Sequence, residues 1–275
     1  MCINLHHDAG TQGYMRDDGP MHAQREEATP EASQESSATA HPYPRITSVV
    51  RSRHSTLSGG QQDTWDRRWP DLGRAARDSE GTPAGLIDTE AWFGRSAPVI
   101  LEIGCGAGIS TLAMAAAEPH LDVIAVEVYR KGLAQLLGAV DRQGLTNIRF
   151  IRGDGVDVLE HMVAPGSLTG VRVFFPDPWP KARHHKRRLL QPATMALIAN
   201  RLRPGGVLHA ATDHAGYAEQ IAEVGDGETL LARIDSDRVA RDDLPISARR
   251  PETKFEAKGR HAGSAITELL WERRS

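Results

Sequence analysis

Apolar runs and amphipathic segments take turns along most of this chain. The apolar runs are strand-like and lie at residues 99–103, 122–127, 147–151, 171–175 and 206–212. The segments between them have helical spacing and lie near residues 109–118, 130–143, 155–163, 191–203 and 214–224. Strands that alternate with helices predict a parallel sheet with helices on both faces. The expected fold class is therefore α/β, with a doubly wound, mostly parallel, Rossmann-like sheet.

The last part of the chain predicts two more strands, near residues 228–234 and 264–272. Residues 266–271 show the period of two that is typical of a strand. The stretch Arg203-Pro-Gly-Gly206 predicts the end of a helix and a turn before the strand at 206–212. We find no internal repeat.

Composition divides the chain into three parts. Residues 1–42 are rich in Ser, Ala, Thr, Glu and Gly and lack apolar periodicity, which predicts a disordered acidic tail. Residues 43–97 are expected to form a basic N-terminal extension, in which a short helix around Trp65 and Trp69 packs on the main domain. Residues 98–275 are expected to form the main, catalytic domain.

The overall composition excludes several classes of protein. Hydrophobic residues make up 40% and charged residues 25%, which is ordinary for a soluble globular protein. No run of about 18 apolar residues occurs, so we expect no membrane span, and the first residues lack the apolar core of a secretory signal. Two cysteines are too few for a disulfide framework. We therefore expect a reduced, cytoplasmic protein.

The net charge of −3 hides an uneven distribution. Residues 1–40 hold seven acidic residues against two arginines, so the rest of the chain is mildly basic. Local basic clusters can therefore bind nucleic acid although the whole protein is acidic.

A glycine-rich loop follows the strand at 99–103. The sequence there is Val99-Ile-Leu-Glu-Ile-Gly-Cys-Gly-Ala-Gly108, which has the pattern E-x-G-x-G-x-G. Such a loop lets a ligand lie against bare backbone. The dinucleotide fingerprint needs its third glycine where this chain has Ile109, whereas the observed pattern is that of proteins that bind S-adenosylmethionine. Cys105 is interpreted as a small filler of the loop and not as a nucleophile.

Acidic residues stand at the carboxyl ends of four predicted strands. They are Glu102, Glu127, Asp154 and Asp177. Ligands of doubly wound sheets bind at these ends, where Glu127 could accept hydrogen bonds from ribose hydroxyls and Asp154 could contact an adenine amino group. The alternative for each carboxylate is a helix cap, most clearly for Asp154.

A proline-braced loop and a basic stretch follow the fourth of these strands. Pro176, Pro178 and Pro180 restrict the backbone around Asp177 and Trp179, which suits the capture of a flat base. The next residues, Lys181-Ala-Arg-His-His-Lys-Arg-Arg188, could hold a phosphate backbone. The two histidines have no third ligand at suitable spacing, so we expect no metal.

Six motifs occur in one order along the chain and together carry a resemblance. They are Leu101-Glu-Ile-Gly-Cys-Gly, Val126-Glu-Val, Gly153-Asp154, Phe175-Pro-Asp-Pro-Trp-Pro-Lys181, Ala211-Thr-Asp213 and Arg250-Pro-Glu-Thr-Lys-Phe-Glu256. Over about residues 45–273 the chain resembles the bacterial tRNA (guanine-N7-)-methyltransferase family. The resemblance implies the fold of S-adenosylmethionine-dependent methyltransferases, S-adenosylmethionine as cofactor, tRNA as partner, and 7-methylguanosine formed in the variable loop.

The resemblance also implies roles for individual residues. The glycine loop and the carboxylates would bind the cofactor through Glu102, Gly104, Gly106, Glu127, Asp154 and Asp177. Substrate contacts would come from Lys181, Asp213, Thr253, Lys254, Phe255 and Glu256. RNA contacts would come from Arg183, His184, His185, Lys186, Arg187 and Arg188.

The chemistry of the reaction makes Asp177 the catalytic candidate. Guanine N7 carries a lone pair and no proton, so no base is needed, and a nearby carboxylate would stabilise the positive charge that the purine gains. An adenine-N6 methyltransferase is disfavoured by the order Pro-Asp-Pro-Trp, and a nicotinamide oxidoreductase by Ile109. An RNA-binding module without activity remains the alternative from another class. We expect a monomer or weak homodimer, with no membrane partner.

Overall fold

The computed structural model describes residues 56–235, 238, 243–251 and 265–275. Every described residue belongs to one compact unit, which spans residues 41–275. The predicted acidic tail, residues 1–42, lies outside the described residues.

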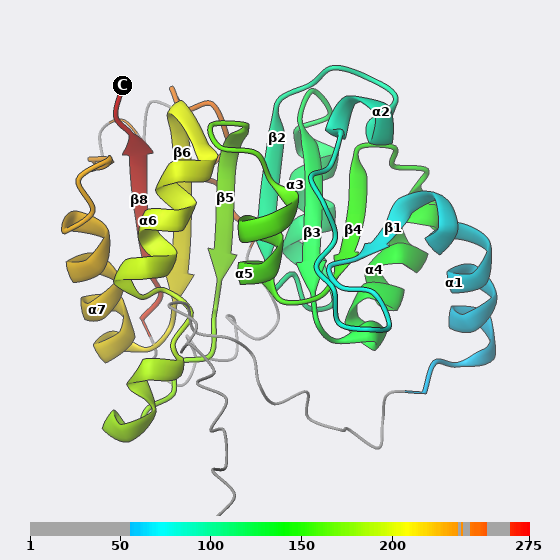
Figure 1. Ribbon diagram of the computed structural model, residues 1–275, viewed down its shortest axis with the longest axis horizontal. Coiled ribbons are helices and arrows are strands. Elements are labelled where there is room, and N and C mark those ends of the chain that lie inside the picture. Colours follow the sequence, from blue (N-terminus) through cyan, green and yellow to red (C-terminus); the bar gives the residue numbers. More distant parts are fainter. Residues whose placement is uncertain (1–55, 236–237, 239–242, 252–264) are drawn as a thin grey trace, which may run out of the picture. The chain divides into compact units, whose positions relative to one another are not determined.

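The described strands form one sheet of eight, in the order β1-β4-β3-β2-β5-β6-β8-β7. Their bounds are β1 Gly73–Ala75, β2 Val99–Ile103, β3 Asp122–Glu127, β4 Ile148–Arg152, β5 Leu168–Phe174, β6 Leu202–Thr212, β7 Leu231–Arg233 and β8 Thr267–Arg273. Strand β8 runs antiparallel to both β6 and β7, and the other pairs are parallel. Figure 1 shows the strands of this sheet in order, from β1 at the right to β8 at the left. The predicted α/β, mostly parallel fold class is confirmed.

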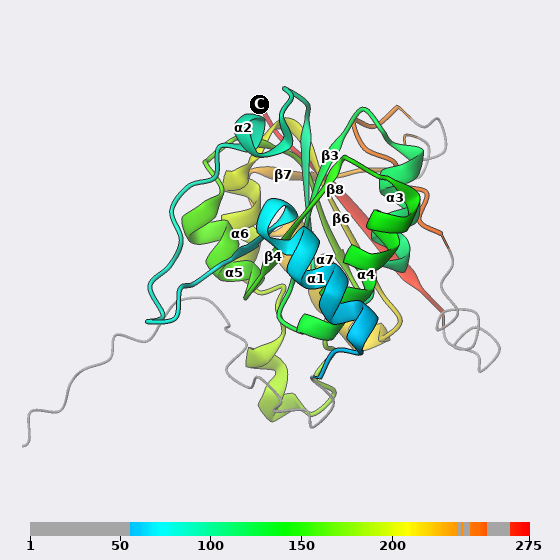
Figure 2. The ribbon, with the colours of Figure 1, turned by 90° about the vertical axis from the view of Figure 1, so that its right-hand side faces the viewer.

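Helices cover both faces of the sheet, as Figure 2 shows for α3 and α4 on one face and α5 and α6 on the other. The helices are α1 Gly59–Leu72, α2 Thr89–Phe93, α3 Ile109–Ala117, α4 Arg130–Gln143, α5 Gly155–Asp157, α6 Pro192–Arg201 and α7 Ala215–Asp226. A π-helical turn, Val158–Met162, continues α5. The sheet therefore separates two buried clusters: one contains side chains of α1, α3 and α4, and the other those of α5, α6 and α7.

Helix α1 forms in the predicted basic extension for clear local reasons. Ser58 caps it through a capping box with Gln61. Trp65 and Trp69 stack with their ring centroids 4.0 Å apart, and both pack in the cluster shared with α4. The helix around these two tryptophans packs against α4 and strand residues of the sheet.

The element order follows the prediction closely, with two differences. Strands β2 and β3 and helix α4 have the predicted bounds. The helix end expected near residue 203 is observed at Arg201, and β6 begins earlier than expected, at Leu202. Residues 203–206 form an irregular stretch of β6, because they have no partners in β5 and Gly205 has a φ angle of 76°. The short strand β1 and helix α2 were not predicted.

The topology places the ligand end of the sheet between β2 and β5. The chain runs outward from β2 through β3 to β4, and then returns to the other side of β2 as β5. Ligands of doubly wound sheets bind at the carboxyl ends of the strands at such a switch point. Among the described helices, none is long and apolar enough to cross a membrane.

Candidate cofactor and substrate site

The glycine loop after β2 adopts a backbone that side chains disfavour. Gly104, Gly106 and Gly108 have φ angles of 79°, 55° and 73°, in the left-handed region that favours glycine. The amide of Gly104 donates to the carbonyl of Val126 at 2.9 Å, which fixes the loop to the end of β3. No described atom lies within 4 Å of where a Cβ would stand on Gly104 or Gly106. The loop therefore presents bare backbone to open space.

Glu127 ties this loop to the start of α4. Its Oε2 accepts from the amide of Gly106 at 3.0 Å, and its Oε1 accepts from the amide of Tyr129 at 2.9 Å. An ionised carboxylate has about four acceptor positions, so both oxygens keep capacity for a further donor such as a hydroxyl. The half-buried Glu127 thus shapes the loop and still presents acceptors at the strand end.

Glu102 is buried beneath the loop and only half satisfied. Thr111 of α3 donates to its Oε1 at 2.9 Å, while no described group bonds its buried Oε2. Burial raises the pKa of Glu102, and the charge of Arg172 and the bond from Thr111 act in the opposite direction. A buried acceptor without a partner is costly. A ligand with a donor group at this position would remove that cost.

Asp154 acts as a helix cap in this structure. It stands at the N-cap of α5, and its Oδ1 accepts from the amide of Val156 at 2.9 Å. The alternative that the sequence left open for Asp154, a helix cap, is therefore observed. The side chain is still half exposed at the end of β4, next to Glu127 on β3 in the sheet. Capping and ligand binding are compatible, because a carboxylate can accept several bonds.

The proline-rich loop after β5 is a strained structure. Phe175 and Trp179 have φ angles of 51° and 41°, which are uncommon for residues other than glycine and cluster at functional sites. Asp177 lies between them and is exposed. The guanidinium carbon of Arg187 lies 5.0 Å from the ring centroid of Trp179. The ring centroids of Trp179 and His184 are 5.8 Å apart. Trp179 is therefore engaged by the basic stretch.

The basic stretch forms a 3-10 helix, Ala182–Arg187, whose members lie mostly at the surface. Lys181, Arg183, Lys186 and Arg187 are exposed, and His184 and His185 are half-buried. Burial and the neighbouring cations lower the pKa of His184. Arg188 differs from the rest, because it is only 2% exposed and points into the protein.

The remaining predicted substrate residues divide into two groups. Asp213 is exposed immediately after β6, next to the loop that carries Asp177 because β5 and β6 are neighbours. Thr253, Lys254, Phe255 and Glu256 lie outside the described residues. The structure describes the segment that leads to them, residues 243–251.

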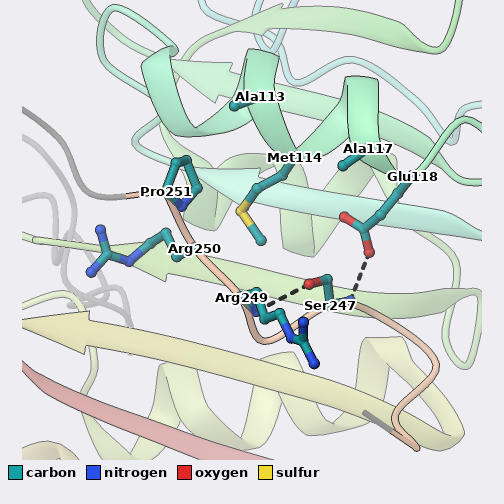
Figure 3. Close-up of a pocket in the computed structure, with 8 residues that line it drawn as sticks. All are labelled: Ala113, Met114, Ala117, Glu118, Ser247, Arg249, Arg250 and Pro251. Atoms are coloured by element: carbon teal, nitrogen blue, oxygen red, sulfur yellow. Dashed lines mark hydrogen bonds between the residues drawn. The ribbon is translucent and has the colours of Figure 1, made fainter.

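That segment packs against α3. The amide of Ser247 donates to Oε1 of Glu118 at 2.7 Å, as Figure 3 shows. A pocket of about 300 Å³ lies between them, lined by Ala113, Met114, Ala117, Glu118, Ser247, Arg249, Arg250 and Pro251. None of the predicted cofactor residues lines this pocket, so it is a feature of the α3 interface and not of the glycine loop.

One cluster of possible metal ligands occurs among the described residues, and it lies elsewhere. Asp157, Glu160 and His161 bring ligand atoms within 4.8 Å of one another. Both oxygens of Asp157 already accept from Arg77, at 2.6 and 2.7 Å. Asp157 is therefore engaged in an ion pair with Arg77, and Glu160 and His161 lie beside that pair. We assign no metal to this cluster.

The sequence reasoning missed Gly132 of α4. A Cβ on this residue would stand 2.5 Å from the carbonyl oxygen of Gly106, so α4 approaches the glycine loop more closely than any side chain permits. The only local signal is a glycine in an otherwise good helix, which often marks close packing.

Comparison with known proteins identifies the family. A family model described as "Putative methyltransferase" matches residues 96–269. A tRNA (guanine-N(7)-)-methyltransferase of Mycobacterium sp. (strain KMS) is 69% identical over 237 residues, which cover 86% of this chain and 84% of that protein. The chain belongs to the tRNA (guanine-N7-)-methyltransferase family. A member of this family from Mycolicibacterium gilvum (strain PYR-GCK) is 64% identical over 267 residues, 94% of this chain and 99% of its own.

Solved structures outside the family are more distant. The aminoglycoside resistance methyltransferase NpmB1 is 16% identical with a TM-score of 0.44, over 72% of this chain and 97% of that one. The 16S rRNA methyltransferase KamB is 14% identical with a TM-score of 0.45, over 72% of this chain and 99% of that one.

Proposed function

We propose that this protein transfers the methyl group of S-adenosylmethionine to N7 of a guanine in the variable loop of tRNA, forming 7-methylguanosine in the cytoplasm. The observation that carries the proposal is the 69% identity to a tRNA (guanine-N(7)-)-methyltransferase over 86% of the chain. The geometry supports it, because a bare glycine loop and exposed Asp177 lie at the carboxyl ends of neighbouring strands.

The residues at the strand ends fit the cofactor. When bound, S-adenosylmethionine supplies an electrophilic methyl group on a cationic sulfur. Gly104 and Gly106 would face it with backbone, and Glu102, Glu127 and Asp154 would accept hydrogen bonds from its ammonium, hydroxyl and amino groups. The unpartnered Oε2 of Glu102 is the feature that such a donor explains best. Asp177 would complete the cofactor set at the end of β5.

Asp177 acts on the guanine side of the reaction. No proton has to leave N7 before attack, so the chain needs to orient the base and to stabilise the charge that develops on it. The exposed carboxylate of Asp177 serves this purpose from a stiff loop. Lys181, Asp213 and the Thr253–Glu256 segment would hold the nucleotide, and the orientation of the reacting groups can supply roughly 7–11 kcal/mol.

The exposed cations of the 3-10 helix would hold the RNA backbone. Lys181, Arg183, Lys186 and Arg187 lie close together at the mouth of the site, with His184 and His185 between them. Phosphate contacts of this kind make affinity fall steeply with salt. N7 faces the major groove even in a paired guanine, so the base need not leave its stack.

One assay tests the proposal. The purified protein is incubated with labelled S-adenosylmethionine and unmodified tRNA, and the product is cleaved chemically at 7-methylguanosine. Label incorporation with cleavage at one variable-loop guanine is the expected result. Asp177→Ala should lose most turnover and still bind the cofactor, because the glycine loop, Glu102, Glu127 and Asp154 remain. Incorporation without cleavage would move the reaction to another atom, and cofactor binding without any incorporation would favour an inactive RNA-binding module.

A further inference from the structure

Arg188 ends the basic stretch but does not share its surface. Its neighbour Arg187 is exposed, whereas Arg188 is 2% exposed and ranks among the largest fully buried side chains. We propose that Arg188 is a positioning residue, which holds the loop of Asp177 through the carbonyl of Pro178, and that it does not contact RNA. This inference rests on the proposed function for its kinetic consequences only.

The guanidinium of Arg188 joins three parts of the chain. Its Nε donates to the carbonyl of Pro178 at 2.8 Å. Its Nη1 donates to Oε1 of Gln220 at 2.6 Å and to the carbonyl of Gly216 at 3.2 Å. Its flat face lies 4.8 Å from the ring centroid of Tyr217. The loop of Asp177 is therefore fastened to the first turns of α7.

The α7 side of this contact is itself rigid. The amide of Leu190 donates to the Tyr217 hydroxyl at 3.0 Å, and burial raises the pKa of Tyr217 to about 12. Gln220 also donates to the carbonyl of Leu190 at 3.3 Å. Tyr217 and Gln220 thus connect α7 to Leu190, which lies two residues after Arg188. These contacts fix the groups that the guanidinium binds.

The loop has few other ways to hold its shape. Three of the residues 176–180 are prolines, which have no amide hydrogen. Arg188 donates a hydrogen bond to the backbone of this stretch, at the carbonyl of Pro178. The loop is also strained at Phe175 and Trp179, and such strain persists only where the surroundings impose it. Arg188 supplies that constraint at the residue directly after Asp177.

Lysine could not replace Arg188 in this role. The guanidinium is a planar fork with five donors, so it can bond Pro178 and Gln220 in different directions and lie flat on Tyr217. An ammonium on a flexible stem keeps the charge but loses this geometry. The substitution Arg188→Lys therefore separates positioning from simple electrostatic attraction to RNA.

The experiment compares Arg188→Lys with Lys186→Ala as the control, because Lys186 is an exposed cation of the same stretch. Arg187 would be a poorer control, since its guanidinium lies 5.0 Å from the ring centroid of Trp179 in the loop. Measured quantities are kcat, the KM for tRNA, the salt dependence of tRNA affinity, and the loop exchange. Loop exchange here means amide hydrogen exchange of Phe175, whose amide donates to the carbonyl of Ala211 at 2.8 Å at the start of the loop. For Arg188→Lys we expect kcat to fall about tenfold or more, because a small misplacement of reacting groups has a large effect on rate. The KM and the salt slope should stay within about twofold of the wild type, and exchange in the loop should be faster.

Lys186→Ala should show the opposite pattern. Its affinity for tRNA should fall, its salt slope should decrease by about one unit, and its loop exchange should stay near that of the wild type. If Arg188→Lys does not fold, Gln220→Leu removes one acceptor and should lower kcat and speed loop exchange without changing the salt slope. A reduced salt slope in Arg188→Lys with unchanged kcat and exchange would overturn the proposal.

Hydrogen exchange also distinguishes this inference from the proposed function. If the wild type does not methylate tRNA, the proposed function fails. Faster loop exchange in Arg188→Lys would still support the positioning role of Arg188. If the wild type is active and Arg188→Lys leaves loop exchange unchanged, the positioning role of Arg188 is overturned and the proposed function stands.

Discussion

The Nη2 atom of Arg172 donates to Oε2 of Glu118 at 2.6 Å inside the protein, where the two side chains are 0% and 7% exposed. Arg172 lies on β5 in register with Glu102 on β2 and His209 on β6. Glu118 directly follows α3 and also accepts from the amide of Ser247. This buried pair therefore fastens the sheet, the end of α3 and the segment that leads to residues 253–256.

Removing one partner of this pair should destabilise the fold strongly. Glu118→Gln leaves Arg172 with an uncompensated buried charge, for which a loss of about 3–5 kcal/mol is expected. Urea unfolding followed by circular dichroism measures this loss. Arg67→Ala is the control, because Arg67 and Asp141 pair at the surface, where ion pairs contribute little. Equal stability of Glu118→Gln and wild type would contradict the view that the pair is buried.

Gly132 should be essential for cofactor affinity although it contacts no ligand. A Cβ at this position meets the Gly106 carbonyl at 2.5 Å, so Gly132→Ala must displace either α4 or the glycine loop. We expect a cost of about 1–3 kcal/mol in stability from overpacking and a clear loss of S-adenosylmethionine affinity, measured by calorimetry.

Gly138 on the same helix is the matched control for Gly132. The nearest atom to its Cβ position is the flexible Nη1 of Arg142, at 3.3 Å. Gly138→Ala should therefore keep its cofactor affinity and gain up to about 1 kcal/mol from helix propensity. If both alanine variants bound the cofactor equally well, the close approach of α4 would not shape the loop.

The sequence predicted the parts of this protein that local pattern determines. Strand β2 and helix α4 have clear periodicity, and Gly144 ends α4 in the left-handed conformation that is common at helix ends. Strand β6 shows the limit of local signals, because Leu202 already pairs with Leu168 of β5, before the irregular stretch Pro204-Gly205-Gly206. The three-residue β1 is too short for a periodic signal, and it forms by pairing with β4.

The sequence names candidate site residues by their type, but it does not show how their side chains are oriented. Arg187 and Arg188 are neighbours of the same type, and no local feature distinguishes the exposed residue from the buried one. The distinction comes from acceptors 10 and 32 positions away, Pro178 and Gln220. Likewise, Asp154 fits both a cap and a ligand by sequence, and only the structure shows that it caps α5.

Cys105 should be chemically inert in the native protein. It is buried in the glycine loop, and burial together with Glu102 and Glu127 raises the pKa of its thiol far above the ordinary value. Since the thiolate is the reactive form, alkylation at pH 8 in a Cys2→Ser background should be slow when folded and fast in urea. Cys105→Ala should keep kcat within about twofold, since a small filler takes no part in the chemistry. Rapid alkylation of the native thiol would contradict this account.

His209 should make the stability of the protein depend on pH. The ring is fully buried, and its Nε2 lies 2.8 Å from Oε2 of Glu268. Burial lowers the pKa of His209 below its ordinary value of 6.5; Glu268 opposes this effect, and the charges of Arg172 and Arg250 add to it. The unfolded chain therefore binds a proton more readily than the folded protein does. The stability that the neutral His209 contributes to the fold is complete above pH 6.5, and it is lost as the pH falls below this value.

The comparison of wild type with His209→Gln tests this dependence. The amide of glutamine can still donate to Glu268 but does not titrate, so the variant should lose less stability than the wild type between pH 8 and pH 5. Urea unfolding at each pH gives both curves, and their difference isolates His209 from the carboxylates that also titrate at the acid end. His120→Gln, at an exposed position, is the matched control and should follow the wild-type curve. If His209→Gln keeps the full wild-type slope, the buried ring is not the origin of the pH dependence, and the pairing of Glu268 with Arg250 at 3.1 Å becomes the group to test next.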